Sequence, residues 1–262
     1  MLEISNLSKT FNKNTINEKI ALDHINLTLK EGDFVTVIGG NGAGKSTLLN
    51  AICGAWNIDA GKILLDGINI TNMADYKRAK FLGRVFQDPM MGTAGEMEIA
   101  ENLAIAHRRG KRRTLRWGMK KQEKANYQTL LAQLDLGLEN RLTSKVGLLS
   151  GGQRQALTLL MATLQKPKLL LLDEHTAALD PKTAAKVLEI TDRIVSEKNL
   201  TTIMITHNMK DAIAHGNRLI MMNEGKIIAD ISGAEKEKLT VEDLLRMFEN
   251  SGTTVNDSAI LA

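Results

Sequence analysis

The sequence has a single cysteine in 262 residues and no long uninterrupted apolar segment. Cys53 has no second cysteine with which to form an internal disulfide, so the chain suits a reducing compartment. No apolar run approaches the roughly 20 residues that span a bilayer. Met1 to Ile4 alternate like a strand instead of forming a basic and then apolar leader, so we expect no signal peptide. These absences predict a cytoplasmic location.

What is present suffices for one large α/β domain, because 43% of the residues are hydrophobic and can bury a sizeable core. Strand-like apolar runs alternate with helical stretches, which is the pattern of a mostly parallel sheet. The expected strands lie at residues 2–7, 34–38, 84–87, 169–173, 202–206 and 219–222. Asn223 to Gly225 reads as a hairpin turn. Helical stretches are expected at 153–165 and, behind Thr240 as a cap, at 239–250.

The most informative segment is the glycine-rich run from Gly39 to Ser46, which fits the pattern G-x-x-x-x-G-K-[ST] and directly follows an apolar strand. Its glycines let successive backbone N–H groups point at phosphate oxygens, to which the next helix adds its positive end. Lys45 supplies a point charge for the β- and γ-phosphates, and the Ser46 hydroxyl can reach Mg²⁺. A chance match or a loop that no longer binds is the alternative, because context confirms such a motif.

That context comes from the leucine run at 169–172, which reads as a buried strand ending in Asp173 and Glu174. Asp173 can hold Mg²⁺ through water, while Glu174, on the opposite side of the strand axis, can polarise an attacking water. The alternative is that the two carboxylates have no catalytic role and simply mark a solvated strand end.

Between these motifs stands the string Leu149-Ser150-Gly151-Gly152-Gln153 at the head of a helical stretch. With it the chain resembles an ATP-binding-cassette (ABC) ATPase, in whose family LSGGQ is the signature motif. A serine and two glycines at a helix N-terminus suit the family role of clasping a γ-phosphate from the far side.

The resemblance extends from about residue 2 to 230 and carries further landmarks. Phe11 matches the aromatic residue that stacks on adenine, although a plain core or surface phenylalanine is the alternative. Gln87 matches the glutamine whose amide reaches Mg²⁺ and the attacking water. Asp180 matches the loop that crosses to a partner subunit, and His207 matches the histidine that contacts the γ-phosphate.

The resemblance therefore implies ATP and Mg²⁺ as cofactors and a P-loop NTPase fold with a mostly parallel sheet, an antiparallel N-terminal β region and an inserted α-helical subdomain. The implied catalytic residues are Glu174, His207, Gln87 and Lys45, and the implied metal-binding residues are Ser46, Gln87 and Asp173. The implied nucleotide contacts are Phe11, Gly39, Asn41, Gly42, Ala43, Gly44, Lys45, Ser46, Thr47, Ser150, Gly151, Gly152, Gln153 and Asp180. The expected division is a core at 1–87 and 166–250, a helical subdomain at 88–165 and a disordered tail at 251–262.

Two positions depart from the family pattern. His175 stands where proline is usual after the catalytic glutamate. We interpret it as a tolerated substitution, although a titrating group there could bias the protonation of the site. Gly40 replaces a frequent proline or serine and should be harmless, because this position contributes backbone alone.

A basic run at 107–124 holds nine lysine or arginine residues against one glutamate. Anionic lipid heads attract such a cluster, and so would nucleic acid. A solvated basic loop is the plain explanation. Trp117 is the sole aromatic residue among these charges, so no stacking platform for bases is evident and nucleic acid is not the expected partner.

Residues 89–97 hold Met90, Met91 and Met97 close to Gln87. Methionine surfaces adapt to inserted partners. In family transporters this surface receives a short helix from the membrane subunit. Core filling is the rival explanation.

The resemblance implies an energising subunit of a transporter on the cytoplasmic side of the membrane, most simply an importer of amino acids, including aromatic ones, or similar solutes. Its implied partners are a second copy of the chain, a multi-span permease and, through the permease, an extracytoplasmic binding protein. A soluble single-cassette ATPase acting in cofactor assembly or on nucleic acid is the alternative, and no long coiled-coil insertion or second cassette favours it.

Overall fold

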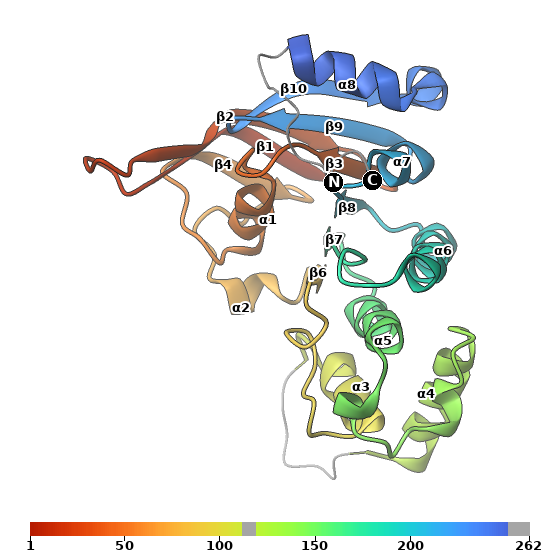
Figure 1. The fold of residues 1–262 in the computed structure, drawn as a ribbon. Helices are drawn as coiled ribbons and strands as arrows, with labels where there is room; N and C mark the ends of the chain where they lie inside the picture. The colour runs from red at the N-terminus through yellow and green to blue at the C-terminus, as the bar shows by residue number, and fades with distance from the viewer. Residues whose placement is uncertain (112–118, 251–262) are drawn as a thin grey trace.

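A computed structural model describes residues 1–111 and 119–250 of the chain. It contains a six-stranded sheet, a four-stranded sheet and helices packed around both (Figure 1). The predicted disorder of 251–262 lies outside the described residues.

The larger sheet is parallel except for its last strand. Its spatial order is β10 (Lys226–Ser232), β9 (Arg218–Asn223), β3 (Phe34–Ile38), β8 (Thr202–Ile205), β7 (Leu169–Asp173) and β6 (Leu82–Val85). Every residue of β3 and β8 is buried, as expected for strands covered on both faces. Glu224 and Gly225 have positive φ angles of 45° and 78° in the turn between β9 and β10, which confirms the predicted hairpin.

The smaller sheet is antiparallel. It runs β2 (Lys19–Leu29), β1 (Leu2–Phe11), β4 (Ala60–Leu65) and β5 (Ile68–Asn69). This is the predicted antiparallel N-terminal region, and β1 is longer than the 2–7 expected from sequence. The extra residues pair with β2 as far as Phe11, which lies opposite Lys19.

The helices are α1 (Lys45–Cys53), α2 (Asp75–Arg78), α3 (Ile99–His107), α4 (Lys121–Ala132), α5 (Gly151–Thr163), α6 (Pro181–Lys198), α7 (Met209–Ala214) and α8 (Val241–Asn250). Short 3₁₀ turns occupy Leu138–Asn140, Val146–Leu148 and Gly233–Lys238. Helices α3, α4 and α5 lie together beyond β6, at the end of the molecule away from the antiparallel sheet (Figure 1). None of the helices in the described ranges is both long and apolar enough to cross a membrane.

The two faces of the large sheet belong to different apolar clusters. Leu170 and Leu172 of β7 pack with the residues of α3, α4 and α5, whereas Leu169 and Leu171 pack with α1 and the antiparallel sheet. Because successive side chains of a strand point to opposite faces, one leucine run serves both clusters. Because β7 is held by both clusters, it determines the positions of Asp173 and Glu174 at its C-terminal end.

Two predicted boundaries were wrong by about two residues. The strand predicted at 84–87 is β6, which ends at Val85, so Gln87 stands on a loop beyond the sheet. The helix predicted from Gln153 begins at Gly151, because Ser150 caps it by accepting a hydrogen bond from the Gln153 N–H. Thr240 accepts from the Asp243 N–H, as its predicted capping role requires.

Candidate nucleotide site

The glycine-rich loop connects β3 to α1 and adopts a backbone that side chains would obstruct. Gly42 and Gly44 have φ angles of 80° and 101°. A Cβ atom on Gly39 would lie 2.3 Å from the carbonyl oxygen of Met222, and one on Gly44 would lie 2.4 Å from that of Ala21. The loop is thus held against β9 and β2 at glycine positions.

Lys45 is the first residue of α1, and its side chain is almost entirely buried. Its Nζ donates to the carbonyl oxygens of Gly39 at 2.6 Å and Gly40 at 3.1 Å, so the ammonium group lies across the mouth of the loop. A lysine and a helix N-terminus converging on one glycine loop form a strongly anion-attracting arrangement.

A cavity of about 230 Å³ opens over this loop. Its wall contains the predicted aromatic residue, glycine-rich loop, glutamate and histidine, together with two residues of β2. The lining residues are Phe11, Lys19, Ala21, Asn41, Gly42, Ala43, Gly44, Lys45, Ser46, Thr47, Glu174 and His207. The fold therefore gathers residues from five separate parts of the sequence at one site.

Glu174 and His207 meet inside this cavity. The Glu174 Oε1 atom lies 2.5 Å from His207 Nε2. These residues follow the neighbouring parallel strands β7 and β8, and the Glu174 N–H donates to the Ile205 carbonyl at 3.1 Å. Glu174 has a φ of 47°, an uncommon backbone for a non-glycine residue that turns its carboxylate toward the loop.

The residues present fit a nucleotide and Mg²⁺. The glycine backbone and Lys45 suit a polyphosphate, and the Ser46 hydroxyl in the same cavity is a hard oxygen ligand of the kind that Mg²⁺ takes beside substrate phosphates. The Asp173 carboxylate, the other predicted ligand, lines a different cavity and pairs with Arg84. In residues 1–111 and 119–250, no group of three or more His, Cys, Asp or Glu residues could hold a metal ion.

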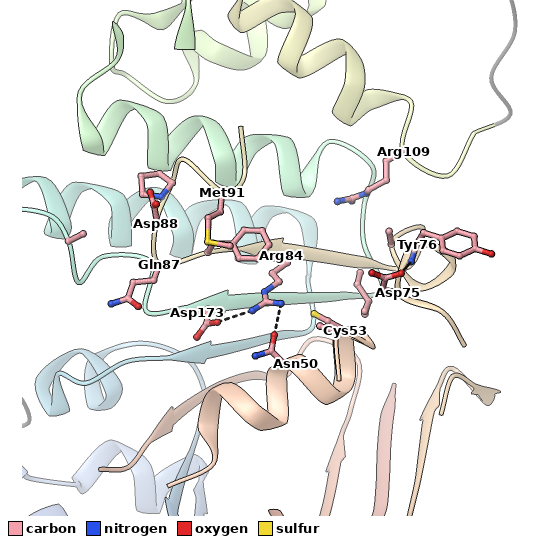
Figure 2. A pocket seen from close by; sticks show the side chains of 16 residues that line it. Asn50, Cys53, Asp75, Tyr76, Arg84, Gln87, Asp88, Met91, Arg109 and Asp173 are labelled. Carbon is pink, nitrogen blue, oxygen red and sulfur yellow. Dashed lines mark hydrogen bonds and ion pairs between the residues drawn. The ribbon is translucent and has the colours of Figure 1, made fainter. Parts of the chain in front are cut away.

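Asp173, unlike its neighbour Glu174, lines a second, larger cavity of about 1020 Å³ (Figure 2). Its Oδ2 accepts from Arg84 Nη2 at 3.0 Å, and Arg84 Nη1 donates to Asn50 Oδ1 at 2.9 Å. The Arg84 guanidinium carbon lies 4.5 Å from the centre of the Phe86 ring. Burial raises the pKa of Asp173, and the Arg84 charge opposes that shift.

Gln87 lines this second cavity as well, beside Asp173, and does not line the phosphate-loop cavity (Figure 2). The Gln155 side chain, which is 1% exposed, donates from Nε2 to the Phe86 carbonyl at 3.1 Å. Helix α5 is thus tied to the residue directly before Gln87. Of the four predicted catalytic residues, Lys45, Glu174 and His207 therefore line the smaller cavity, and Gln87 lines the larger one.

The signature residues form the start of α5. Ser150 Oγ accepts from the Gln153 N–H at 3.3 Å, and Gln153 Oε1 accepts from the Ser150 N–H at 3.2 Å, which is a capping box. A Cβ on Gly152 would lie 2.1 Å from Thr183 Cγ2 of α6, whose N-cap is Asp180. Ser150, Gly151, Gly152, Gln153 and Asp180 line neither cavity, so within one chain they do not join the phosphate loop.

His175 points into the core instead of the site. It is 2% exposed, and its Nε2 lies 3.0 Å from the hydroxyl of Thr191 on α6. Burial, reinforced by the charge of His215, lowers the pKa of His175 to about 4. The imidazole is therefore neutral near pH 7, which agrees with a tolerated substitution.

The basic run is partly structural. Arg108 pairs with Glu123 at 3.2 Å, and Arg109 Nη2 donates to the carbonyls of Ala162 and Gln165. The remaining described lysines of the run are exposed: Lys111, Lys120, Lys121 and Lys124. Arg112, Arg113, Arg116 and Trp117 lie outside the described residues.

The methionine-rich segment presents Met90 and Met91 to solvent, with exposed fractions of 48% and 69%. Core filling does not explain these two residues. Met91 lines the larger cavity beside Gln87 (Figure 2).

Lys19, Arg84 and Asn50 line the two cavities but are not among the site residues predicted from the sequence. Arg84 alternates with apolar neighbours in its strand, and an arginine at a buried position predicts a carboxylate partner. Nothing in the sequence indicates which partner. Lys19 could be found only from the register of β1 against β2.

Comparison with known proteins agrees with this geometry. Residues 22–177 match the ABC transporter family. The tyrosine transport ATP-binding protein of Clostridioides difficile (strain R20291) is 49% identical over 95% of this chain and 99% of its own length. The methionine import ATP-binding protein MetN of Bartonella henselae is 31% identical over 88% of this chain and 64% of its own length.

Solved structures show the same fold. The dimeric, post-hydrolysis cassette MJ0796 bound to ADP and Pi has a TM-score of 0.76 at 28% identity, over 88% of this chain and 98% of that one. The ADP conformation of the cassette MJ1267 has a TM-score of 0.77 at 27% identity, over 95% of this chain and 98% of that one.

Fold and site together define an ATP-binding cassette with a P-loop NTPase core. The chain belongs to the ABC transporter family and is of its ATP-hydrolysing type. This confirms the fold, family and activity predicted from the motifs.

Proposed function

We propose that this ATPase powers a membrane importer of amino acids, with aromatic amino acids such as tyrosine as the first candidates. The observation that carries the proposal is a complete phosphate-loop cavity in a chain that matches a tyrosine transport ATP-binding protein over almost the whole length of both. The transported molecule itself would contact the permease and the extracytoplasmic binding protein, and not this chain.

In the proposed mechanism, Phe11 stacks on adenine, and the residues from Gly39 to Thr47 cradle the phosphates. Lys45 neutralises the charge on the transferred phosphoryl group. Glu174 polarises the attacking water, and the 2.5 Å contact with His207 positions its carboxylate. Mg²⁺, held by Ser46, Asp173 and Gln87, would offset the phosphate charge when bound.

We further propose that two copies enclose two ATP molecules, because Ser150, Gly151, Gly152, Gln153 and Asp180 line neither cavity of their own chain. Ser150 of one copy would face the phosphate held by Lys45 of the other. ATP would close this dimer through contacts that exist only in the closed state, and hydrolysis would reopen it.

The larger cavity lies between the proposed core at 1–87 and 166–250 and the proposed helical subdomain at 88–165, and it is the proposed contact for the permease on the cytoplasmic face of the membrane. Asp173, Gln87 and exposed Met91 all line it, so a segment seated there would touch the hydrolytic machinery directly. A methionine side chain adapts its shape to such an insertion.

The test is to tag the chain, purify it from detergent-solubilised membranes of its own cells and identify stoichiometric companions by mass spectrometry. We expect a multi-span membrane protein, and the binding protein captured with it can be titrated directly with tyrosine and other amino acids. Recovery from the soluble fraction alone, or with nucleic acid or assembly proteins, would contradict the proposal.

A further inference from the structure

We propose that Lys19 is a second phosphate-binding cation, which holds the nucleotide between the adenine-stacking ring and the glycine loop. The inference rests on the proposed nucleotide site and adds to it a residue outside the loop motif. It also assigns that residue to the part of the nucleotide that ATP and ADP share.

The position of Lys19 follows from strand pairing. Lys19 is the first residue of β2 and lies opposite Phe11, the last residue of β1. Side chains of directly opposed residues stand on the same face of an antiparallel pair. Both residues accordingly line the phosphate-loop cavity.

The ammonium group of Lys19 reaches the loop itself. A Cβ atom on Gly42 would lie 2.7 Å from Lys19 Nζ, so the charge lies directly over the loop backbone. Lys45 occupies the other flank, where its Nζ contacts the Gly39 and Gly40 carbonyls. An anion bound between the two lysines would be neutralised from both sides.

Neighbouring lysines differ from Lys19 in having carboxylate partners. Lys9 and Lys13 lie 3.6 Å and 3.2 Å from oxygens of Asp59, and Lys226 lies 3.3 Å from Asp23. The Lys19 side chain has no hydrogen-bond or ion-pair partner among residues 1–111 and 119–250. An unpaired cation directed over an anion-binding loop is available to the ligand without first breaking another contact.

The pairing with Phe11 places Lys19 toward the nucleoside end of the site. It is thus suited to the α- and β-phosphates, which ATP and ADP have in common, and not to the γ-phosphate. Because the side chain is exposed, water and salt screen its charge, and we expect a contribution of about three- to tenfold in affinity.

The experiment measures equilibrium binding of ATP, ADP and adenosine by calorimetry, with Mg²⁺ present, for the full chain and for Lys19→Met, Lys19→Arg and Lys226→Met. We expect Lys19→Met to weaken ATP and ADP binding equally, by about three- to tenfold, and adenosine binding by less than about twofold. Lys19→Arg should restore most of the affinity, because it keeps the charge. Lys226→Met, which removes a nearby cation that does not line the cavity, should leave all three affinities unchanged.

Unchanged ATP and ADP affinities in Lys19→Met would overturn the inference, as would a loss confined to ATP. An equal loss of affinity in Lys226→Met would show that binding depends on general surface charge, and this result would also overturn the inference. Failure of the unaltered chain to bind ATP would instead overturn the proposed nucleotide site. Thermal unfolding of each variant confirms that the binding data report on folded protein.

Discussion

The two cavities are built differently, although adjacent residues of one strand end line them. Asp173 lines the cavity of about 1020 Å³, whereas Glu174 lines the cavity of about 230 Å³. The smaller cavity takes most of its wall from the consecutive residues 41–47, whose backbone does the binding. The larger one takes its wall from the loop at 86–91 after β6 and from side chains scattered over α1, α2, β6, the segment after α3 and the end of β7. A site made of contiguous backbone leaves a motif in the sequence, and a site made of dispersed side chains does not.

The largest expected effect concerns the smaller cavity. We expect Glu174→Gln to lower steady-state ATP hydrolysis by roughly 10²-fold or more, because the amide cannot accept the proton of the attacking water. ATP binding should persist, since the phosphate loop is unchanged, and the variant should accumulate as a dimer with ATP in size-exclusion chromatography. Glu242→Gln, which makes the same change at an exposed position of α8 outside both cavities, is the control and should leave hydrolysis unchanged. Hydrolysis at the original rate in Glu174→Gln would remove this residue from its proposed role.

The same contrast between the two cavities explains which parts of the fold and site could be predicted from the sequence. The loop, the strand of leucines and the signature string are local patterns with backbone roles, so the fold and most of the smaller cavity were predictable. The ion pair of Arg84 with Asp173 joins residues 89 positions apart and depends on the parallel register of β6 with β7. Such a contact is invisible before the strands are paired, and the same is true of Lys19 beside Phe11.

A matched pair of glycine substitutions tests whether backbone shape defines the smaller cavity. In Gly39→Ala the new methyl group would lie 2.3 Å from the backbone oxygen of Met222, and the loop would have to shift away from β9. We expect at least a tenfold loss of ATP affinity and a loss of about 2 kcal/mol in unfolding free energy. Gly40→Ala meets nothing within 4 Å and should bind ATP within about twofold of the unaltered chain.

Calorimetric ATP titration and thermal unfolding of both alanine variants provide the measurement. Equal affinities for the two variants would show that side-chain contacts, and not the packing of the loop against β9, determine the shape of the site.

The larger cavity is tested by removing the cation that faces Asp173. Arg84→Met should lower the unfolding free energy by about 2 kcal/mol, because a largely buried carboxylate loses its charged partner. The pKa of Asp173, already raised by burial, should rise further. Asn50→Ala breaks the other Arg84 hydrogen bond while leaving the ion pair, so it should cost less, about 1 kcal/mol.

Denaturant unfolding of Arg84→Met, Asp173→Asn and the double variant measures the coupling directly. A positive coupling of about 1 kcal/mol or more is expected for a contact of 3.0 Å. Additive losses would mean that the two side chains do not interact, and that the wall of the larger cavity is held by other contacts.

The smallest effect belongs to His175, the third consecutive residue, which enters neither cavity. Its pKa of about 4 in the folded chain lies below the ordinary value of 6.5, so the unfolded state takes up a proton first as the pH falls. The stability associated with the neutral imidazole is present above pH 6.5 and is lost progressively as the pH falls from 6.5 toward 4. Between pH 7.5 and 5.5 we expect this one group to account for about 1 kcal/mol of lost stability.

The measurement is denaturant unfolding of the unaltered chain and of His175→Gln across that pH range. The glutamine can still bond to the Thr191 hydroxyl and does not titrate, so the difference between the chains isolates His175 from its neighbours His215 and Asp192. Parallel pH profiles for the two chains would contradict the assignment of a buried, neutral imidazole. Converging profiles at low pH, with ATP hydrolysis by His175→Gln unchanged at pH 7.5, would assign His175 to the core, next to Asp173 in the wall of the larger cavity and Glu174 in the wall of the smaller one.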